Sequence, residues 1–290
     1  MSSLDLIIVL VYLAFMVLIG FVSKKKIKQQ DDYVLAGRKM GYTLTIGMLV
    51  SIMIGTSATM GTAAMGYEFG MVLVWQALAI LAGYVVVGFI AKRLRNTGKW
   101  YIPDIMEERY GRSAKIFTSI ILILAVIAIF GAQIIAMGII FNMVGNPFGI
   151  SYSVAIIIVG LILVLYTMSG GMFAVAYTDI IQFSIILLLF VVILPAFILS
   201  DGPTLEAIQI SVDPDLWSIW TGLPFLFVLG LIFTYLPGII IDQTIWQRMM
   251  SAKDEKVAKF SSFASGVIFL FYTIVILALG IIASGVIPNL

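Results

Sequence analysis

The sequence predicts an all-α membrane protein with eight transmembrane helices, and three observations lead to that prediction. Apolar residues make up 62% of the 290 residues and charged residues only 11%, whereas soluble domains average about 45–50% and about 25%. Uncharged runs recur along the chain, and each is long enough to cross about 30 Å of hydrocarbon as a helix. The basic residues fall into three clusters that are separated by even numbers of these runs.

Charged clusters or turn residues separate the eight predicted helices. Charge-free stretches place them at residues 4–22, 43–66, 71–91, 116–141, 150–169, 173–199, 218–241 and 260–287. Between residues 116 and 200 the only charge is Asp179, so two divisions there depend on turn chemistry. Gly145-Asn146-Pro147 predicts one loop, and Ser169-Gly170-Gly171 predicts a very short reversal with a positive φ.

The positions of the basic residues predict the orientation. All 17 Lys and Arg lie within residues 24–39, 92–115 and 248–259, which eight crossings place on one side. The opposite side holds acidic residues such as Asp5, Glu68 and Asp213, and no basic residue. The positive-inside rule makes the basic side cytoplasmic. We therefore expect a multi-pass protein of the plasma (inner) membrane with its N-terminus outside, embedded in the lipid bilayer and binding no nucleic acid.

The composition argues against an enzyme. The chain contains no cysteine and no histidine, which removes disulfides, thiol nucleophiles and imidazole acid–base chemistry. Asp179 and Asp242 lie on different predicted helices, and the sequence shows no partner for either. We expect no catalytic residues and no cofactor.

Two predicted helices contain helix-breaking residues near their middle. Residues 47–62 hold three glycines together with Thr56, Ser57, Thr59 and Thr62; glycine weakens a helix by about 1 kcal/mol relative to Ala, and hydroxyl side chains compete for backbone hydrogen bonds. Such a stretch either packs closely against a neighbour or unwinds to face a ligand, and we favour unwinding within 51–58. Pro237-Gly238 predicts a second break within 235–240. Two interrupted helices five spans apart indicate inverted repeats with a midplane site.

Few polar side chains lie inside the predicted spans. Asp179 and Asp242 both sit within about two turns of the cytoplasmic surface, where each is either functional or an interfacial or capping carboxylate. Isolated polar residues are interpreted first as helix–helix hydrogen bonds; they are Tyr12, Gln76, Gln133, Tyr166 and Gln182.

Four motifs resemble one known family. Residues 166–182 contain Ser-Gly-Gly, then Ala-Val, then Thr-Asp-x-x-Gln, and closely resemble the signature of the sodium:solute symporter family. Residues 32–38 resemble the family's first inner loop, residues 101–111 its Pro-Asp…Glu-x-Arg-Tyr-Gly loop, and residues 242–248 its Asp-Gln-x-x-x-Gln-Arg stretch. The four motifs occur in family order and at matching places in the predicted topology.

The resemblance implies a LeuT-type inverted-repeat transporter that works by alternating access. Residues 1–290 would form a single transmembrane domain, with a peripheral helix at 4–22 and the first five-helix repeat at 43–199. Residues 218–287 would be the first two helices of the second repeat. Because that repeat would be incomplete, we expect the chain to be part of a longer transporter, with a natural minimal form as the alternative.

The resemblance also implies the site residues. Sodium would bind the backbone carbonyls of Ser51 and Ile54 and hydroxyls on a ninth helix. Solute contacts would come from Thr56, Ser57, Ala58, Thr59, Gln76 and Tyr235. Asp179 would lie on the ion pathway, and the inner gate, or a structural equivalent, would comprise Asp242, Gln243, Gln247 and Arg248. Met53 replaces the Asn or Asp that is common in the family, and Gly55 replaces Ser, so the ion would depend on backbone oxygens.

The implied function is sodium-coupled symport of a small organic solute, with sodium as the only metal. Sugars, amino acids, pantothenate and monocarboxylates all remain open as solutes. The alternative is a solute-sensing membrane input domain of a signalling protein, which would require a cytoplasmic output module.

Overall fold

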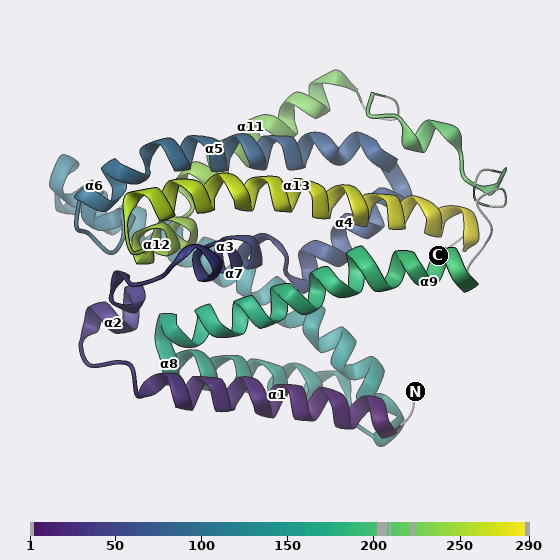
Figure 1. Ribbon diagram of the computed structural model, residues 1–290, viewed down its shortest axis with the longest axis horizontal. Coiled ribbons are helices and arrows are strands. Elements are labelled where there is room, and N and C mark those ends of the chain that lie inside the picture. Colours follow the sequence, from purple (N-terminus) through teal and green to yellow (C-terminus); the bar gives the residue numbers. More distant parts are fainter. Residues whose placement is uncertain (1–2, 202–207, 209, 221–223, 288–290) are drawn as a thin grey trace.

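The structure is a computed structural model that describes residues 3–201, 208, 210–220 and 224–287. It is built from helices, which Figure 1 shows running roughly along one long axis. In chain order they are α1 (Ser3–Lys24), α2 (Gln30–Leu35), η1 (Ala36–Arg38), α3 (Tyr42–Met53), α4 (Thr56–Phe69), η2 (Gly70–Leu73), α5 (Val74–Asn96), α6 (Ile102–Tyr110), α7 (Arg112–Gly145), η3 (Asn146–Phe148), α8 (Tyr152–Leu187), η4 (Leu188–Ile193), α9 (Leu194–Asp201), η5 (Pro214–Trp217), α11 (Phe225–Ile241), α12 (Gln243–Ser251) and α13 (Glu255–Val286).

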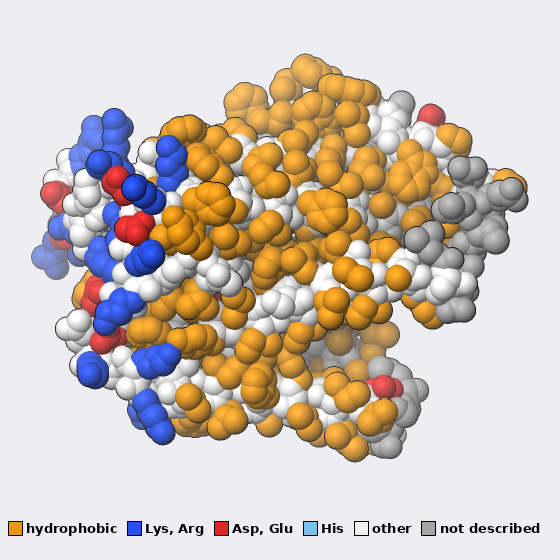
Figure 2. Space-filling view, viewed as in Figure 1, with side chains coloured by type: hydrophobic (Ala, Val, Ile, Leu, Met, Phe, Trp, Pro, Cys, Tyr) orange, Lys and Arg blue, Asp and Glu red, His pale blue; other side chains and the backbone are white. Residues whose placement is uncertain are grey.

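The basic residues gather at one end of the molecule. Figure 2 shows Lys and Arg at the left end and a broad hydrophobic band along the rest of the visible face. Hydrogen bonds join the three basic clusters there: Arg38 Nη2 donates to the Gly98 carbonyl at 3.1 Å, and Arg95 Nη1 donates to the Met250 carbonyl at 3.2 Å. The predicted one-sided distribution of basic residues is therefore confirmed.

Five helical segments are long and apolar enough to cross a membrane within the described ranges, or six if the bent pair α11–α12 is one span. Two further predicted spans correspond to shorter apolar helices, at residues 42–53 and 152–165. The structure thus supports an all-helical membrane protein, and the count of eight stays a prediction.

The predicted break in the helix at 43–66 is confirmed. Helix α3 ends at Met53, and α4 begins at Thr56. Between them, Ile54 has φ −99° and ψ 69°, and Gly55 is extended, with φ −104° and ψ 168°.

The predicted break within 235–240 is wrong. Helix α11 continues through Pro237 to Ile241, and the chain bends by 44° at Asp242 instead. A proline removes only its own backbone donor and crowds one preceding carbonyl, and α11 tolerates that loss. The predicted start at residue 218 is also wrong, because residues 218–220 are not helical and α11 begins at Phe225; residues 221–223 lie outside the described residues.

The short reversal at Ser169-Gly170-Gly171 is confirmed inside α8. Gly171 has φ 50° and ψ −147°, a conformation that favours glycine. A Cβ at this position would lie 2.6 Å from the Tyr33 carbonyl oxygen, so close backbone packing also requires glycine. Further along, η4 is a π-helical turn that ends two residues before Pro195 and widens the helix near a residue that cannot donate a backbone hydrogen bond.

Helix α13 is the packing centre of the fold. It contacts α5, α4 and α3, and its face towards them carries small residues such as Ser262, Ser265 and Gly280, all buried. Small residues let two helix backbones approach closely. Tyr84 of α5 is fully buried between these helices, and its hydroxyl donates to the Leu49 carbonyl of α3 at 2.7 Å.

Candidate functional site

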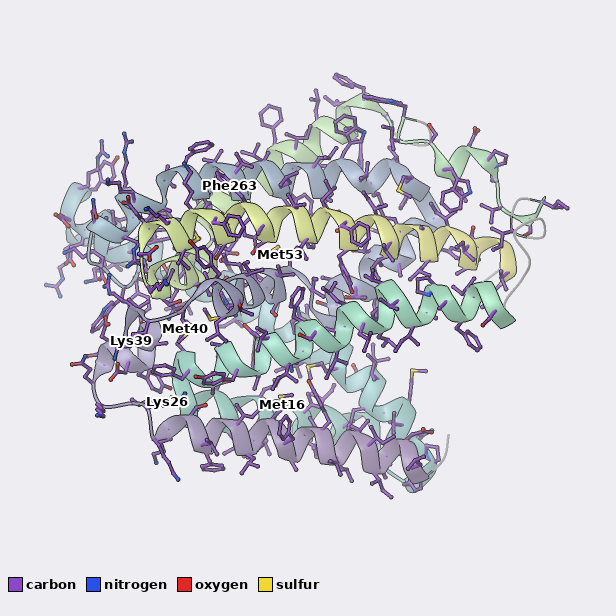
Figure 3. The ribbon with its side chains drawn as sticks, viewed as in Figure 1. Met16, Lys26, Lys39, Met40, Met53 and Phe263 are labelled. Atoms are coloured by element: carbon purple, nitrogen blue, oxygen red, sulfur yellow. The ribbon has the colours of Figure 1, made fainter. Side chains whose placement is uncertain are left out.

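The α3–α4 break leaves a group of carbonyls without helical partners. Within the described chain, no backbone N–H donates to the carbonyl oxygens of Ser51, Ile52, Met53 or Ile54. The last carbonyls of any helix lack intrahelical partners, but here the next helix begins only two residues later. Figure 3 places Met53 near the middle of the molecule's long axis, within the helical bundle. The break therefore presents free backbone oxygens about midway along the long axis of the molecule.

Side chains from two other helices hold the start of α4. Gln133 of α7 accepts a hydrogen bond from the Ser57 backbone N–H through Oε1, at 3.3 Å. The hydroxyls of Thr59 and Tyr272, the latter on α13, lie 2.9 Å apart and share a hydrogen bond. Two of the predicted solute contacts, Ser57 and Thr59, therefore already have protein partners.

Helix α3 is held by two hydroxyl-to-carbonyl hydrogen bonds, one of them close to its end. Ser51 Oγ donates to the backbone carbonyl of Asp179 on α8 at 3.1 Å. On the other side, Ser265 Oγ of α13 donates to the Ile46 carbonyl at 3.4 Å. Ser51 therefore connects the break directly to the residue predicted on the ion pathway.

The remaining predicted solute contacts come from other helices. Gln76 lies on α5 and Tyr235 on α11, and these two helices pack together. Both side chains are partly buried, and Tyr235 packs against the main hydrophobic core. Neither makes a hydrogen bond to residues 56–59 in the described structure, so their convergence with α4 is not shown.

Asp179 has a partner that the sequence does not reveal. Arg248 Nη2 lies 3.0 Å from Asp179 Oδ2, and the two side chains are only 14% and 12% exposed. The expectation that Asp179 lacks a visible partner is therefore corrected. Because the partners are 69 residues apart, only the packing of α12 and α8 against α3 brings them together.

Asp242, Gln243 and Gln247 hydrogen-bond to backbone groups at the basic end. Asp242 Oδ1 caps α12 by accepting from the Thr244 and Ile245 backbone N–H groups, at 2.7 and 3.2 Å. Gln243 accepts from the Ile102 N–H at 2.7 Å and donates to the Trp100 carbonyl, while Gln247 donates to the Val34 carbonyl. Asp242 is therefore a capping carboxylate, while the two glutamines tie α12 to α2 and to the start of α6.

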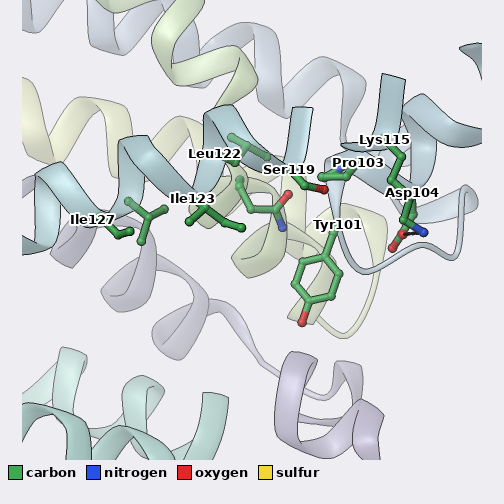
Figure 4. Close-up of a pocket in the computed structure, with 10 residues that line it drawn as sticks. Tyr101, Pro103, Asp104, Lys115, Ser119, Leu122, Ile123 and Ile127 are labelled. Atoms are coloured by element: carbon green, nitrogen blue, oxygen red, sulfur yellow. Dashed lines mark ion pairs between the residues drawn. The ribbon is translucent and has the colours of Figure 1, made fainter. Parts of the chain in front are cut away.

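A separate cavity of about 400 Å³ lies at the basic end, between α6, α7 and the start of α12 (Figure 4). Its polar rim includes Tyr101 and Gln243, and an ion pair joins Lys115 to Asp104 at 3.1 Å. Its walls are apolar side chains of α7. Of the predicted site residues only Gln243 lines it, so this cavity is distinct from the α3–α4 break.

Sequence reasoning missed Gln133 and Tyr272 as parts of the site. Gln133 does carry a signal, because it is the only polar side chain in α7 between Ser119 and Asn142. Its assignment as a helix–helix hydrogen bond is confirmed, but its partner at the break is 76 residues away. Tyr272 offers no comparable signal in the sequence.

Comparisons with known proteins are consistent with this geometry. A model of the sodium:solute symporter family matches residues 33–289. The osmoregulated proline transporter OpuE of Bacillus subtilis (strain 168) is 28% identical over 275 residues, covering 89% of this chain and 54% of that protein. The sodium/proline symporter of Escherichia coli (strain K12) is 27% identical over 236 residues, covering 76% and 46%.

A solved structure shares the fold. It is a Na⁺-coupled sialic acid symporter in a substrate-bound outward-open state, with a TM-score of 0.78 and 21% sequence identity. The match covers 97% of this chain and 60% of that one. The chain spans about half the length of the curated relatives it matches.

Proposed function

The chain belongs to the sodium:solute symporter family, and from that premise we propose that it works in sodium-coupled symport of a small organic solute by alternating access. The family and the matched relatives are transporters rather than enzymes. Because the relatives are about twice as long, the activity of the whole protein is part of this proposal.

The observation that carries the proposal is the α3–α4 break. Four consecutive carbonyls, from Ser51 to Ile54, accept no backbone hydrogen bond in the described chain. Non-helical backbone at membrane depth is tolerated where it is buried in protein or lines a cavity, and broken helices with free carbonyls coordinate sodium in transporters. Carbonyl oxygens are also the ligands that hard cations prefer. We assign sodium to the carbonyls of Ser51 and Ile54.

The solute site belongs to the same proposal. Thr56, Ser57, Ala58 and Thr59 form the start of α4, directly beyond the break, with Gln76 and Tyr235 as further contacts. Two of the relatives are named as proline transporters, so proline is the first solute to test. Asp179 would lie on the ion pathway, and its pair with Arg248 would help to close the inner side.

The membrane topology is part of the same proposal. The eight crossings would be formed by α1, by α3 with α4, by α5, by α7, by the two halves of α8 that meet at Gly171, by α11 and by α13. The basic end would face the cytoplasm, and α1 would begin outside. The domain division also remains part of the proposal, with residues 43–199 as the first repeat and α11 and α13 as the first two helices of the second.

Uptake of radiolabelled proline into proteoliposomes that hold the full-length transporter, rather than the 290 residues alone, tests the function. We expect an inward sodium gradient to drive accumulation above the equilibrium level, because sodium bound at the break would be released down its gradient with the solute. A proton gradient without sodium is the control. Uptake driven by protons and indifferent to sodium would contradict the coupling ion. If proline fails, a panel of sugars, other amino acids and monocarboxylates distinguishes the wrong solute from the wrong function.

A further inference from the structure

A single polar side chain of α7 reaches the α3–α4 break. Gln133 stands alone among apolar residues in the middle of this helix, and a polar group at such depth costs free energy unless it is hydrogen-bonded. Its Oε1 accepts from the Ser57 N–H at 3.3 Å. We propose that Gln133 is a positioning residue that keeps the break open, and that sodium affinity depends on it.

The physical reason is competition for one backbone donor. In a continuous helix the Ser57 N–H would bond to the carbonyl four residues earlier, which belongs to Met53. In this structure Gln133 supplies the acceptor instead, so the Met53 carbonyl is left free. The side chain of a third helix thereby replaces the bond that would join α3 to α4.

Gly55 makes room for this contact. A Cβ at Gly55 would lie 2.5 Å from Gln133 Nε2 and 3.1 Å from its Cδ and Oε1. Any side chain at residue 55 would therefore displace the amide. The Gly55 backbone is extended with a negative φ, so its conformation alone does not require glycine. The close approach of Gln133 gives the physical reason for glycine at this position.

The inference rests on the proposed function, because it concerns sodium bound at the break. Binding of ²²Na⁺ to the purified full-length transporter tests it without transport. The variant Gln133→Leu keeps the size of the side chain but loses the acceptor. We expect the sodium concentration at half-saturation to rise about two- to tenfold, the range for one lost hydrogen bond. Gln133→Glu keeps an acceptor oxygen at the same reach, and it should bind sodium no more weakly than the wild type.

Two glycine variants supply a second test of the same contact and a matched control. Gly55→Ala should weaken sodium binding as Gln133→Leu does, and the double variant should be no weaker than the worse single variant, because both changes remove the same contact. Gly61 lies on α4, six residues after Gly55, and a Cβ added there would have nothing within 4 Å. Gly61→Ala should therefore leave sodium binding within about twofold of the wild type.

Two results would overturn the inference: unchanged sodium affinity in Gln133→Leu, or an equal loss in Gln133→Glu, which would show that shape rather than an acceptor matters. A wild type that binds no sodium overturns both this inference and the sodium assignment. A wild type that binds sodium without sodium-driven uptake contradicts the proposed symport alone.

Discussion

Replacing Arg248 with methionine should destabilise the protein by about 3–5 kcal/mol, because it leaves a buried carboxylate without its counter-ion. The Asp179 side chain is only 12% exposed, and Arg248 is its only ion-pair partner in the described structure. Methionine keeps most of the side-chain volume, so the loss of stability reports the missing charge rather than lost packing. Thermal and denaturant unfolding in detergent would measure the change.

Two variants control this expectation. Arg109 lies exposed on α6 with no ion pair among the described residues, so Arg109→Met should change stability by less than about 0.5 kcal/mol. The double variant Asp179→Asn with Arg248→Met removes both charges and should be more stable than Arg248→Met alone. If Arg248→Met is as stable as Arg109→Met, the pair contributes nothing.

Replacing Gly280 with alanine should have the second large effect, a loss of about 1–3 kcal/mol from overpacking. A Cβ at Gly280 would overlap the Ala63 carbonyl oxygen and lie 3.0 Å from the Tyr67 backbone nitrogen. Across the same contact, a Cβ at Gly66 would lie 2.6 Å from the Leu277 carbonyl oxygen. Since backbone atoms on both sides must move, α4 and α13 would separate.

Gly61→Ala is the matched control, because it also lies on α4 but faces open space. It should be neutral or stabilise the protein by up to about 1 kcal/mol, the helix propensity gain of alanine. Unfolding temperatures of the two variants give the comparison. Equal stability of Gly280→Ala and Gly61→Ala would show that the α4–α13 contact is looser than the structure describes.

Local chemistry made several features predictable from the sequence. The break at residues 54–55 follows from the density of glycine and hydroxyl residues, and the reversal at Gly171 follows from two adjacent glycines. The gathering of basic residues at one end follows from their spacing between apolar runs. Each of these features depends on residues that are close in the chain.

Features that depend on distant contacts were not predictable. The sequence identifies Pro237 as a helix breaker, but α11 continues through it to Ile241, and the carboxylate of the next residue, Asp242, caps α12. The Asp179–Arg248 pair and the Gln133–Ser57 bond join residues 69 and 76 positions apart. No periodicity in the sequence encodes such partners, because they meet only when whole helices pack.

The central claim is that sodium binds at the α3–α4 break, and a single cysteine tests it most directly. The chain contains no cysteine, so Met53→Cys introduces one thiol beside the free carbonyls. Its rate of modification by a small water-soluble thiol reagent would be measured in sodium and in choline, with Arg109→Cys on α6 as the control. We predict that sodium slows modification at residue 53 several-fold and leaves residue 109 unaffected. Equal rates at residue 53 in sodium and choline would contradict the claim.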